Sequence, residues 1–234
     1  GGIPFDLWFP ASPNIEPQKC DQFALGYFRN FLNDEIETSV EVYYKKMYNV
    51  IDFVDNASFI GNLYIDGEVR KGKGYAYGIE FLARKNFGDF SGWISYTYSK
   101  SMRKTPGINF DREYVSPYDK PHNVSIVLNY AFNKRFDVSA TWVYTTGQPV
   151  TYPCGKYTVD GVTYAIYDGR NNSRYPDYHR LDLSATIKCK EKKNWQGEWN
   201  FSVYNAYGRK NTWAVLFLTE GNSINTQKVA LFSF

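Results

Sequence analysis

The feature that most constrains the fold of this sequence is an unbroken alternation of polar and apolar residues over RLDLSATIK, residues 180–188. Only a β-strand, in which successive side chains point to opposite faces, separates such residues into a polar and an apolar set. The alternation does not say what each face contacts. In a soluble sandwich the apolar face is the core, whereas in a membrane barrel it meets lipid and the polar face lines the interior.

Similar alternating segments recur along the whole chain. They are 19–31, 36–53, 74–87, 91–101, 122–132, 136–148, 177–188, 198–208 and 227–234. Tight turns are predicted near residues 33, 88, 134 and 193, and long loops are predicted between the other segments. Short turns at one end and long loops at the other are typical of an outer-membrane barrel. The sequence therefore predicts an all-β fold, an antiparallel transmembrane β-barrel to which this chain contributes about nine strands.

Composition agrees with a membrane barrel and excludes two other classes. The chain has a mean hydropathy of -0.49 and no run of about 18 apolar residues, so a transmembrane helix is excluded. Its net charge is +3 without a block of lysine or arginine, so we expect no nucleic-acid partner. Aromatic residues make up 19% of the chain and stand near the ends of the apolar faces, as in the girdles of membrane barrels.

The barrel interpretation assigns the two faces of the strands. The residues expected to face lipid include Val124, Ile126, Leu128, Leu181, Leu183 and Ile187. The polar residues expected to face the interior are Glu41, Glu80, Arg84, Asp137, Arg180, Asp182 and Lys188. Ion pairs among these side chains explain the carboxylates more simply than acid-base catalysis does.

The number of strands bears on the extent of the barrel. If the chain ends on the periplasmic side, the tight turns are periplasmic and the long loops are extracellular. An odd number of strands then begins from outside, whereas a complete bacterial barrel has an even number. We therefore expect residues 1–234 to be the C-terminal segment of a single barrel domain, without its N-terminal strands. The start of the chain lacks the basic and apolar regions of a signal peptide.

The longest loop, about residues 150–178, carries the candidates for ligand contact. They are Tyr152, Tyr157, Tyr164, Tyr167, Arg170, Asn171 and Arg174. Aromatic rings can stack on a ligand, and arginine and asparagine can hydrogen-bond to it. The alternative, a loop that covers the mouth of the barrel without touching a ligand, is equally consistent with these residues.

Other chemistry is poorly supported by the sequence. The two histidines, His122 and His179, each open a strand without nearby partners, which argues against a metal or haem site. Cys20 and Cys154 can pair only if both lie at the same rim. No nucleophile turn of the form Gly-x-Ser-x-Gly and no phosphate-binding glycine loop occurs. We expect neither an enzyme nor a bound cofactor.

Several segments resemble the C-terminal half of TonB-dependent outer-membrane receptors. They are SPNIEPQKCDQFALGY (12–27), GKGYAYGIEF (72–81), SPYDKPHNVSIVLNY (116–130) and RYPDYHRLDLSATI (174–187), which follow the order of the family. The first segment departs from the family pattern, with Ser12 where asparagine is usual and Ile15 where leucine is usual. The terminal Phe234, with Phe232, is similar to the aromatic assembly signal of outer-membrane proteins.

The resemblance implies a 22-stranded barrel in the outer membrane of a Gram-negative bacterium, filled by an N-terminal plug that this chain lacks. It implies TonB-dependent uptake of a siderophore, cobalamin, haem, glycan or peptide, and the residues do not say which. The implied partners are lipid or lipopolysaccharide, the plug and N-terminal strands, the TonB complex and, in some systems, a surface lipoprotein. A secreted glycan-binding β-sandwich and, with less support, a membrane-barrel enzyme are the alternatives.

Overall fold

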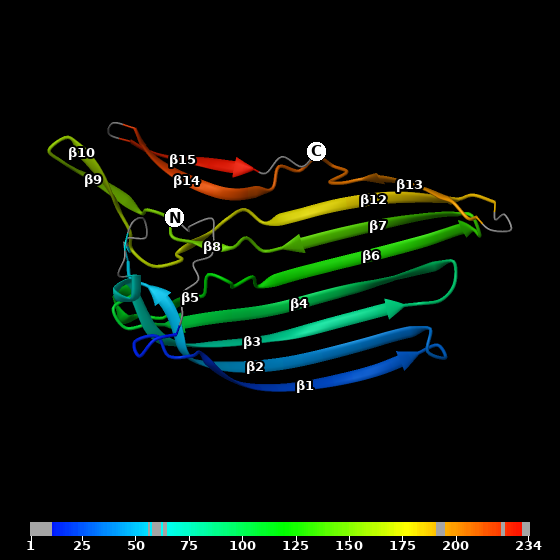
Figure 1. Ribbon diagram of the computed structural model, residues 1–234, viewed down its shortest axis with the longest axis horizontal. Helices are drawn as coiled ribbons and strands as arrows, with labels where there is room; N and C mark the ends of the chain where they lie inside the picture. Colours follow the sequence, from blue (N-terminus) through cyan, green and yellow to red (C-terminus); the bar gives the residue numbers. More distant parts are fainter. Residues whose placement is uncertain are drawn as a thin grey trace.

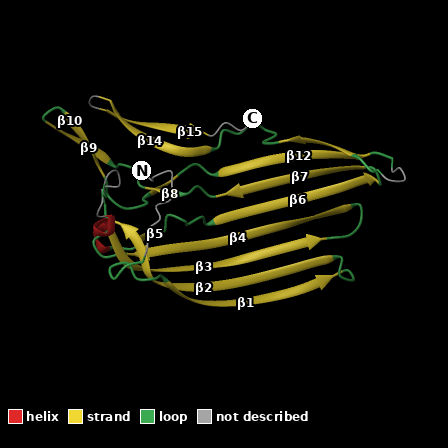
Figure 2. Cartoon of the chain, in the orientation of Figure 1, coloured by secondary structure: helices red, strands yellow, loops and turns green. Residues whose placement is uncertain are grey.

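The computed structural model describes residues 11–55, 57, 62, 65–190, 195–220 and 223–230. These residues are almost entirely β-structure, with two short 3-10 turns, η1 (Ile65–Glu68) and η2 (Asn109–Asp111) (Figure 2). No helix in this part of the chain is long and apolar enough to cross a membrane. Phe232 and Phe234, the expected assembly signal, lie outside the described residues.

Nine strands form one antiparallel sheet. Its long strands, in spatial order, are β1 (Lys19–Phe31), β2 (Ile36–Phe53), β3 (Val69–Lys85), β4 (Phe90–Lys104), β6 (His122–Asn133), β7 (Phe136–Thr145), β12 (Tyr178–Lys188) and β13 (Glu198–Val203). The short β5 (Tyr114–Val115) pairs with the end of β4. Each long strand pairs with the next long strand along the chain, so the sheet is a single-layer meander (Figure 1).

The remaining strands pair outside this sheet. β8 (Pro149–Val150) pairs with β11 (Ser173–Arg174), β9 (Gly155–Val159) with β10 (Val162–Ile166), and β14 (Thr212–Glu220) with β15 (Ser223–Ala230). The tight connections β1–β2, β3–β4 and β6–β7 lie at one end of the sheet, and β5, η2 and the β9–β10 hairpin lie at the other (Figure 1). The predicted turns near residues 33, 88 and 134 therefore lie at the end opposite the long loops, and the predicted turn near 193 lies outside the described residues. We call the two ends the turn end and the loop end.

The predicted strand segments were mostly right, and the long connections were described less well. The 150–178 segment was predicted as the longest loop, and it contains the β9–β10 hairpin and the short β8–β11 pair, for which no strands were predicted. β14 was missed because AVLFL is a continuous apolar run without alternation. β13 ends at Val203 and not near residue 208; Asn205, two residues later, has a positive φ of 53°, where the backbone leaves the extended conformation.

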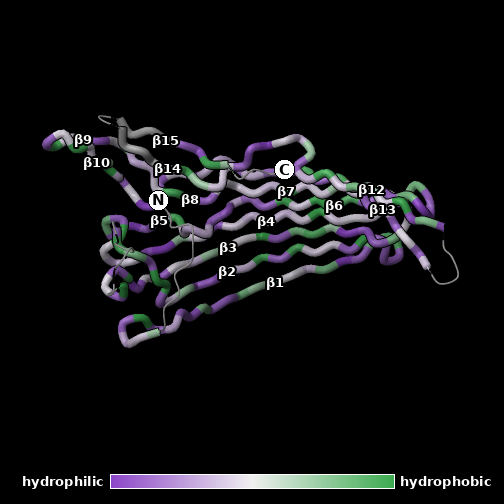
Figure 3. Tube along the Cα trace, turned by 45° about the horizontal axis from the view of Figure 1, so that its top comes forward, coloured by the Kyte–Doolittle hydropathy of each residue, from purple (hydrophilic) through white to green (hydrophobic). Residues whose placement is uncertain are grey.

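Strand register gathers the apolar side chains on one face of the sheet, which we call the apolar face. Ile126 lies opposite Ile94 on β4 and Trp142 on β7, and Trp142 lies opposite Leu181. A second row contains Leu128, Ala140, Leu183 and Val203. Figure 3 shows the resulting alternation of hydrophobic and hydrophilic residues along the strands. Cross-strand pairing of this kind fixes the register, because a slip by one residue would mix the faces.

Many side chains of the apolar face are exposed, with no protein packed against them. Leu183 is 42% exposed, Ile94 42% and Ile79 40%. The accessible surface of the chain is 16138 Å², whereas a self-contained globular protein of this mass exposes about 10,900 Å². The fully buried apolar residues gather instead near the loop end, among them Val50, Val69, Ile108, Tyr114 and Val150. Within the described residues no second sheet covers the apolar face, so the soluble sandwich is not supported.

Candidate functional site

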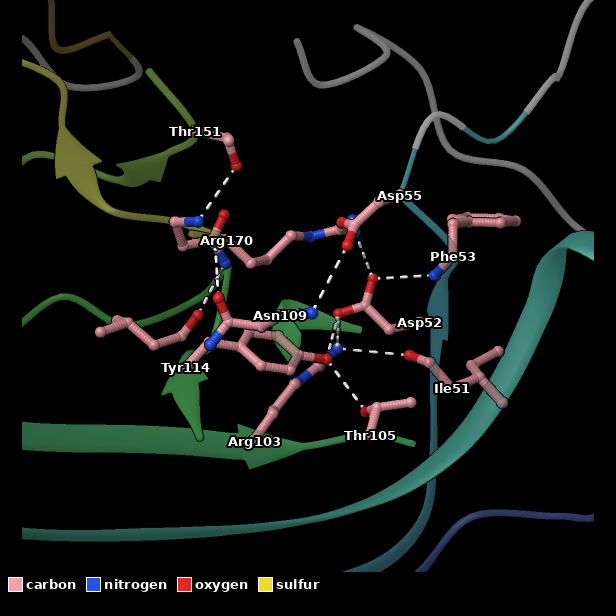
Figure 4. A network of polar contacts seen from close by, with 12 residues as sticks. Ile51, Asp52, Phe53, Asp55, Arg103, Thr105, Asn109, Tyr114, Thr151 and Arg170 are labelled. Atoms are coloured by element: carbon pink, nitrogen blue, oxygen red, sulfur yellow. Dashed lines mark hydrogen bonds and ion pairs between the residues drawn. The ribbon is translucent and has the colours of Figure 1, made fainter. Parts of the chain in front are cut away.

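A cluster of charged and polar side chains joins the connections at the loop end (Figure 4). This Asp52 cluster consists of Asp52, Asp55, Arg103, Thr105, Asn109, Tyr114 and Arg170. Its members come from the end of β2, the end of β4, η2, β5 and the segment between β10 and β11. Segments that lie far apart in the sequence are therefore tied together at one place.

Asp52 is the centre of this cluster. Its Oδ2 accepts a hydrogen bond from the Tyr114 hydroxyl at 2.9 Å and lies 3.5 Å from Nη1 of Arg103, while its Oδ1 lies 2.7 Å from Nη2 of Arg170. The side chain of Asp52 is only 9% exposed and that of Arg103 only 12%. Charge-assisted bonds with so little solvent contact are stronger than those of a surface ion pair.

Tyr114 supplies a neutral donor to this carboxylate. It is 3% exposed, and its hydroxyl also contacts the hydroxyl of Thr105 at 2.9 Å. Burial, and after it the negative charge of Asp52, raises the pKa of the Tyr114 hydroxyl far above its ordinary value. The proton therefore stays on Tyr114, where it can be donated to Asp52.

Asn109 holds the η2 turn and connects it to the longest loop. Its φ of 55° is in the left-handed region, which asparagine tolerates better than most residues. Its Nδ2 donates to the carbonyls of Arg112 at 3.3 Å and Glu113 at 3.1 Å, and its Oδ1 accepts from the backbone N–H of Arg170 at 2.8 Å. Arg170 is thus bound through its backbone and its side chain.

A second anchor of the longest loop is the ion pair between Arg174 and Asp119. Asp119 is 2% exposed, and its Oδ1 accepts from the backbone N–H of Ser101 at 2.6 Å. Nη1 of Arg174 donates to the carbonyls of Asp119 at 2.9 Å and Gly147 at 3.2 Å. These bonds connect the end of the longest loop to β4 and to the segments that precede β6 and follow β7.

Asp177 forms a third contact, immediately before β12. Its Oδ2 accepts from the Tyr144 hydroxyl at 2.7 Å, and its Oδ1 accepts from the backbone N–H of Gly147 at 2.9 Å. The Tyr144 hydroxyl and then the Gly147 N–H lower the pKa of the Asp177 carboxyl, because both bonds favour its charged form. Position 147 needs glycine, since a Cβ there would overlap the carbonyl oxygen of Tyr175.

This lowered pKa predicts a pH dependence. A carboxyl with a lowered folded-state pKa contributes stability above its unfolded pKa of about 3.9, and the contribution is lost as the pH falls through the lowered value. Asp177→Asn should therefore lower the melting temperature at pH 7, and its difference from the wild type should disappear in acid. Melting curves of the full-length receptor in detergent between pH 7 and pH 3 test this. The exposed Asp160→Asn is the control; a wild-type advantage at Asp177 that does not change with pH would contradict the prediction.

A cavity of about 620 Å³ opens beside these anchors, on the face opposite the apolar face. Lys120, Tyr178, Arg180, Tyr204, Arg209 and Trp213 are among the residues that line it. Its volume is in the range of small-molecule sites, about 300 to 1,000 Å³. The described lining residues include no aspartate or glutamate, so the charged side chains of this wall are all cations, and aromatic rings lie among them.

The cations of this wall differ in how firmly they are held. Arg180 pairs with Asp182 at 2.8 Å and lies 4.0 Å from the centroid of the Tyr204 ring, so its position is fixed. Arg209 donates to the carbonyl of Asp177 at 2.8 Å and to Oδ1 of Asn211 at 3.2 Å. Lys120 makes no ion pair with any described residue and is exposed. The two arginines of the wall are therefore held in place by the protein, whereas the ammonium group of Lys120 is available to bind an anion.

The predicted ligand-contacting residues separate into two groups. Arg170, Asn171 and Arg174 make bonds within the protein; Asn171 donates from Nδ2 to the carbonyl of Val115 at 2.6 Å. Tyr157 and Tyr164 lie opposite each other on the β9–β10 hairpin, with ring centroids 5.3 Å apart, and are 51% and 47% exposed. Tyr167 is 40% exposed, whereas Tyr152 is half-buried. Ligand contact by any of them stays a prediction.

The polar residues that were assigned to the interior lie together on the face opposite the apolar face. Glu41 lies opposite Glu80, and the row that begins at Arg84 continues through Thr141 to Asp182. Lys188 pairs with Asp137 at 3.7 Å, and both are partly exposed. Val124, Leu181 and Ile187 belong to the apolar face.

The histidines and cysteines have simple surroundings. Nδ1 of His122 contacts the Tyr96 hydroxyl at 2.9 Å, and Nδ1 of His179 contacts the Tyr207 hydroxyl at 2.7 Å. Among the described residues no group of three or more histidines, cysteines and acidic residues could hold a metal ion. Cys20, Cys154 and Cys189 are free thiols.

Sequence reasoning missed the residues that hold the loop end together. Asp52, Arg103 and Tyr114 carry no local pattern that separates them from ordinary polar positions. Asp119 and Asp177 had a weak signal, because each lies within a segment that resembles the receptor family, but no role was assigned to them. Their partners are distant in sequence, so only the fold brings them together.

Comparisons with known proteins agree with this architecture. A family model described as TonB dependent receptor-like, beta-barrel, matches residues 4–206. The solved structure of the ferric-catecholate import receptor Fiu from K12 E. coli, in its closed form, is 15% identical, with a TM-score of 0.57 over 95% of this chain and 29% of that one. The outer-membrane ferripyoverdine receptor of Pseudomonas aeruginosa, bound to ferripyoverdine, is 14% identical, with a TM-score of 0.57 over 96% and 28%. No curated protein sequence matches the chain.

Proposed function

The chain belongs to the TonB-dependent receptor-like β-barrel family, and on this premise we propose that it forms part of the wall and extracellular loops of a nutrient-uptake receptor. The family consists of receptors and transporters of the Gram-negative outer membrane, and the chain is therefore an outer-membrane protein. It spans 29% and 28% of the two solved receptors that it resembles. Coupled transport is a proposal for the whole receptor, of which these strands are one part.

The proposed arrangement places the loop end outside the cell and the turn end in the periplasm. The apolar face then meets lipid, and the opposite face, with Arg180, Asp182 and Lys188, lines the barrel. This orientation follows the family rule of short periplasmic turns and long extracellular loops. In the whole receptor a plug would lie against the polar face, and the TonB complex would act through that plug. A surface lipoprotein over the loops is a further partner that these residues do not require.

The observation that carries the proposal is the cavity of about 620 Å³. It opens on the polar face at the loop end, where a ligand entering from outside would first meet the wall. Its cations, Lys120, Arg180 and Arg209, lie beside aromatic rings. This chemistry suits a ligand with negatively charged oxygen atoms and flat rings. We therefore favour a ferric siderophore over cobalamin, a neutral glycan or a peptide, and haem is the nearest competitor.

Loop anchoring fits the same role. Arg170 and Arg174 tie the longest loop to the ends of β2 and β4, which leaves Tyr157, Tyr164 and Tyr167 exposed beyond those anchors. Binding residues held on rigid supports lose less entropy when they bind a ligand. Both similar solved structures are receptors for iron complexes, a ferric catecholate and ferripyoverdine, which supports iron uptake without assigning a ligand here.

The proposal is tested on the full-length receptor with a ferric catecholate as the probe. Lys120→Gln should weaken binding about 10-fold, because one charge-assisted contact is lost while the barrel is left intact. Lys134→Gln, at the β6–β7 turn, is the matched control and should bind as the wild type does. Binding is measured by fluorescence quenching, and uptake by radioactive iron in cells that lack other siderophore receptors.

Two results would count against the proposal. If cells carrying the wild-type receptor import neither iron catecholate nor haem, the assignment to iron uptake is wrong. If import occurs but Lys120→Gln binds as well as Lys134→Gln, the cavity is not the ligand wall. A saturable uptake that requires TonB and is weakened only by Lys120→Gln would support both parts.

A further inference from the structure

Arg209 differs from the other half-buried arginines of the described chain because it has no carboxylate partner. The other four, which each form an ion pair with an aspartate, are Arg103, Arg170, Arg174 and Arg180. Arg209 is half-buried as they are, yet it forms no ion pair with any residue that the structure describes. Charged side chains are seldom taken out of water without a partner, because the lost hydration is costly. Arg209 therefore lacks the counterion that the other four have.

Asp177 does not supply this counterion, although it lies beside Arg209. Nη2 of Arg209 donates to the backbone carbonyl of Asp177 at 2.8 Å and not to its carboxylate. That carboxylate instead accepts from the Tyr144 hydroxyl at 2.7 Å and from the Gly147 N–H at 2.9 Å. The charges of Asp177 and Arg209 attract each other only beyond the distance of an ion pair. The guanidinium charge is therefore left without a direct partner.

The guanidinium group of Arg209 also keeps free hydrogen-bond donors. Its Nε donates to Oδ1 of Asn211 at 3.2 Å, and its Nη2 uses one N–H for the carbonyl of Asp177. Both N–H groups of Nη1 and the second N–H of Nη2 have no partner within the described part of the chain. Neighbouring N–H groups on Nη1 and Nη2 form a planar fork that binds both oxygen atoms of a carboxylate at once.

Arg180, on the same wall, has little of this capacity left. Its Nε and Nη2 both donate to Oδ2 of Asp182, at 2.9 and 2.8 Å, so its charge is neutralised. Its Nη1 donates to the hydroxyls of Tyr178 and Tyr204. Arg209 is therefore the arginine of the wall whose fork is available to a ligand.

The backbone of Arg209 is held in place within segment 205–211, which connects β13 to β14. Asn205, 6% exposed, donates from Nδ2 to the carbonyl of Arg209 at 3.0 Å and accepts from its N–H at 3.2 Å. Asn211 donates from Nδ2 to the carbonyl of His179 at 3.0 Å and accepts from its N–H at 3.2 Å, which ties the segment to β12. Because the backbone is fixed on both sides of the arginine, binding a ligand there costs little ordering entropy.

The free donors of Arg209 belong to the wall of the cavity of about 620 Å³. No aspartate or glutamate is among the described residues of that wall, so the missing counterion does not come from the wall itself. An anion that enters the cavity would meet a cation that is partly removed from water and not neutralised. A charge-assisted bond in such surroundings is stronger than one at an open surface.

We propose that the Nη1–Nη2 fork of Arg209 binds a carboxylate of the ligand, so that the receptor prefers iron complexes that carry a free carboxylate. The inference rests on the proposed function and adds the chemical group that the wall selects. Lys120 has a different role, because a flexible ammonium group binds an anionic oxygen without requiring two of them in one plane. We commit to the ligand and not to an acidic side chain of the receptor, because the donors lie in the wall of a cavity of ligand size.

The test compares two probes on the full-length receptor in detergent, with fluorescence quenching as the measure of affinity. One is the ferric complex of dihydroxybenzoylserine, which keeps a free carboxylate, and the other is the ferric complex of its carboxamide, which has none. The wild type should bind the carboxylate probe about 10-fold more tightly, as expected for one charge-assisted bidentate contact. Arg209→Lys keeps the positive charge but removes the fork, so this preference should disappear while the carboxamide probe binds nearly as before.

Two further variants separate recognition of the carboxylate from loosening of the wall. Arg112→Lys changes an exposed arginine at the loop end that does not line the cavity, and it should leave both affinities unchanged. Asn211→Ala removes the side-chain bonds of segment 205–211 to His179, so it should weaken both probes by the same factor and keep the preference. If Arg209 only supported the wall, Arg209→Lys would behave as Asn211→Ala does.

The preference for the carboxylate probe decides the outcome. Its loss in Arg209→Lys, together with its retention in Arg112→Lys and Asn211→Ala, supports the proposal. Equal affinity of the wild type for the two probes overturns the proposal, and so does a preference that survives in Arg209→Lys. If Arg209→Lys lowers the melting temperature of the ligand-free receptor and weakens both probes alike, the counterion of Arg209 is an acidic group of the receptor, which also overturns it.

The same measurements separate failure of this inference from failure of the proposed function. A wild-type receptor that binds neither ferric complex would overturn the proposed iron uptake, and the role of Arg209 with it. Binding of both probes that Lys120→Gln weakens, but that does not depend on the carboxylate, would overturn the role of Arg209 alone and leave the uptake proposal standing.

Discussion

Leu183→Arg is expected to destabilise the barrel by about 2 to 4 kcal/mol, the cost of an arginine on a lipid-facing strand near the bilayer midplane. Leu183 is in the middle of β12, opposite Ala140 on one side and Val203 on the other. It is 42% exposed in the isolated chain, so an arginine would meet no protein core. The whole effect would therefore come from hydrocarbon around the apolar face.

The matched control for this variant is Ser202→Arg. Ser202 lies on the neighbouring strand opposite Ser184, at nearly the same height but on the polar face. It is exposed, and an arginine there should change the free energy of unfolding by less than about 0.5 kcal/mol. Both variants of the full-length receptor would be unfolded by urea in lipid vesicles, with tryptophan fluorescence as the readout. If Leu183→Arg is as mild as Ser202→Arg, the apolar face does not meet lipid.

The same residues show why the sheet was predictable from sequence. Leu181, Leu183 and Ile187 alternate with charged or hydroxylated residues, and an alternation with a period of two residues indicates a β-strand. The alternation fixes the register as well, because any slip would bring Leu183 to the face of Ser184. β14 shows the limit of this reasoning. Its AVLFL run has no alternation, so it was absorbed into a loop that the structure shows to be a hairpin.

The candidate site was not predictable in the same way. Asp52 and Arg170 lie 118 positions apart; Asp52 is at the end of the alternating segment 36–53, and Arg170 lies in the longest loop, so neither position has a signal that points to the other. Their contact depends on the whole meander, which brings the end of β2 beside the longest loop. Arg170 was singled out from its residue type as a candidate for ligand contact. In the structure its guanidinium group forms ion pairs with Asp52 and Asp55. The residue type therefore indicated that Arg170 would bind an anionic or polar group, but not which one.

Asp52→Ala should be the most damaging single change at the loop end. It would leave Arg103, 12% exposed, and Arg170, 20% exposed, without their shared acceptor, and would also remove the acceptor of the Tyr114 hydroxyl. Removing one partner of a buried ion pair typically costs about 3 to 5 kcal/mol, because the remaining charge is buried without compensation. Arg170 keeps Asp55, so we expect about 3 kcal/mol, near the lower limit.

Asp55→Ala is the control that separates the stability lost with a buried carboxylate from the stability lost with an exposed one. Asp55 pairs with the same arginine at 3.0 Å, but its side chain is 53% exposed, so its loss should cost less than about 1 kcal/mol. Both variants remove one carboxylate from Arg170. Asp55→Ala also removes the acceptor of a long bond, 3.4 Å, from the Asn109 N–H, whereas only Asp52→Ala takes the carboxylate from Arg103 and from the Tyr114 hydroxyl. Urea unfolding of the full-length receptor gives the stabilities, and limited proteolysis of the 150–178 loop shows whether the loop is released. Equal effects of the two variants would mean that charge alone holds the loop; a large effect confined to Asp52 would mean that the buried network does.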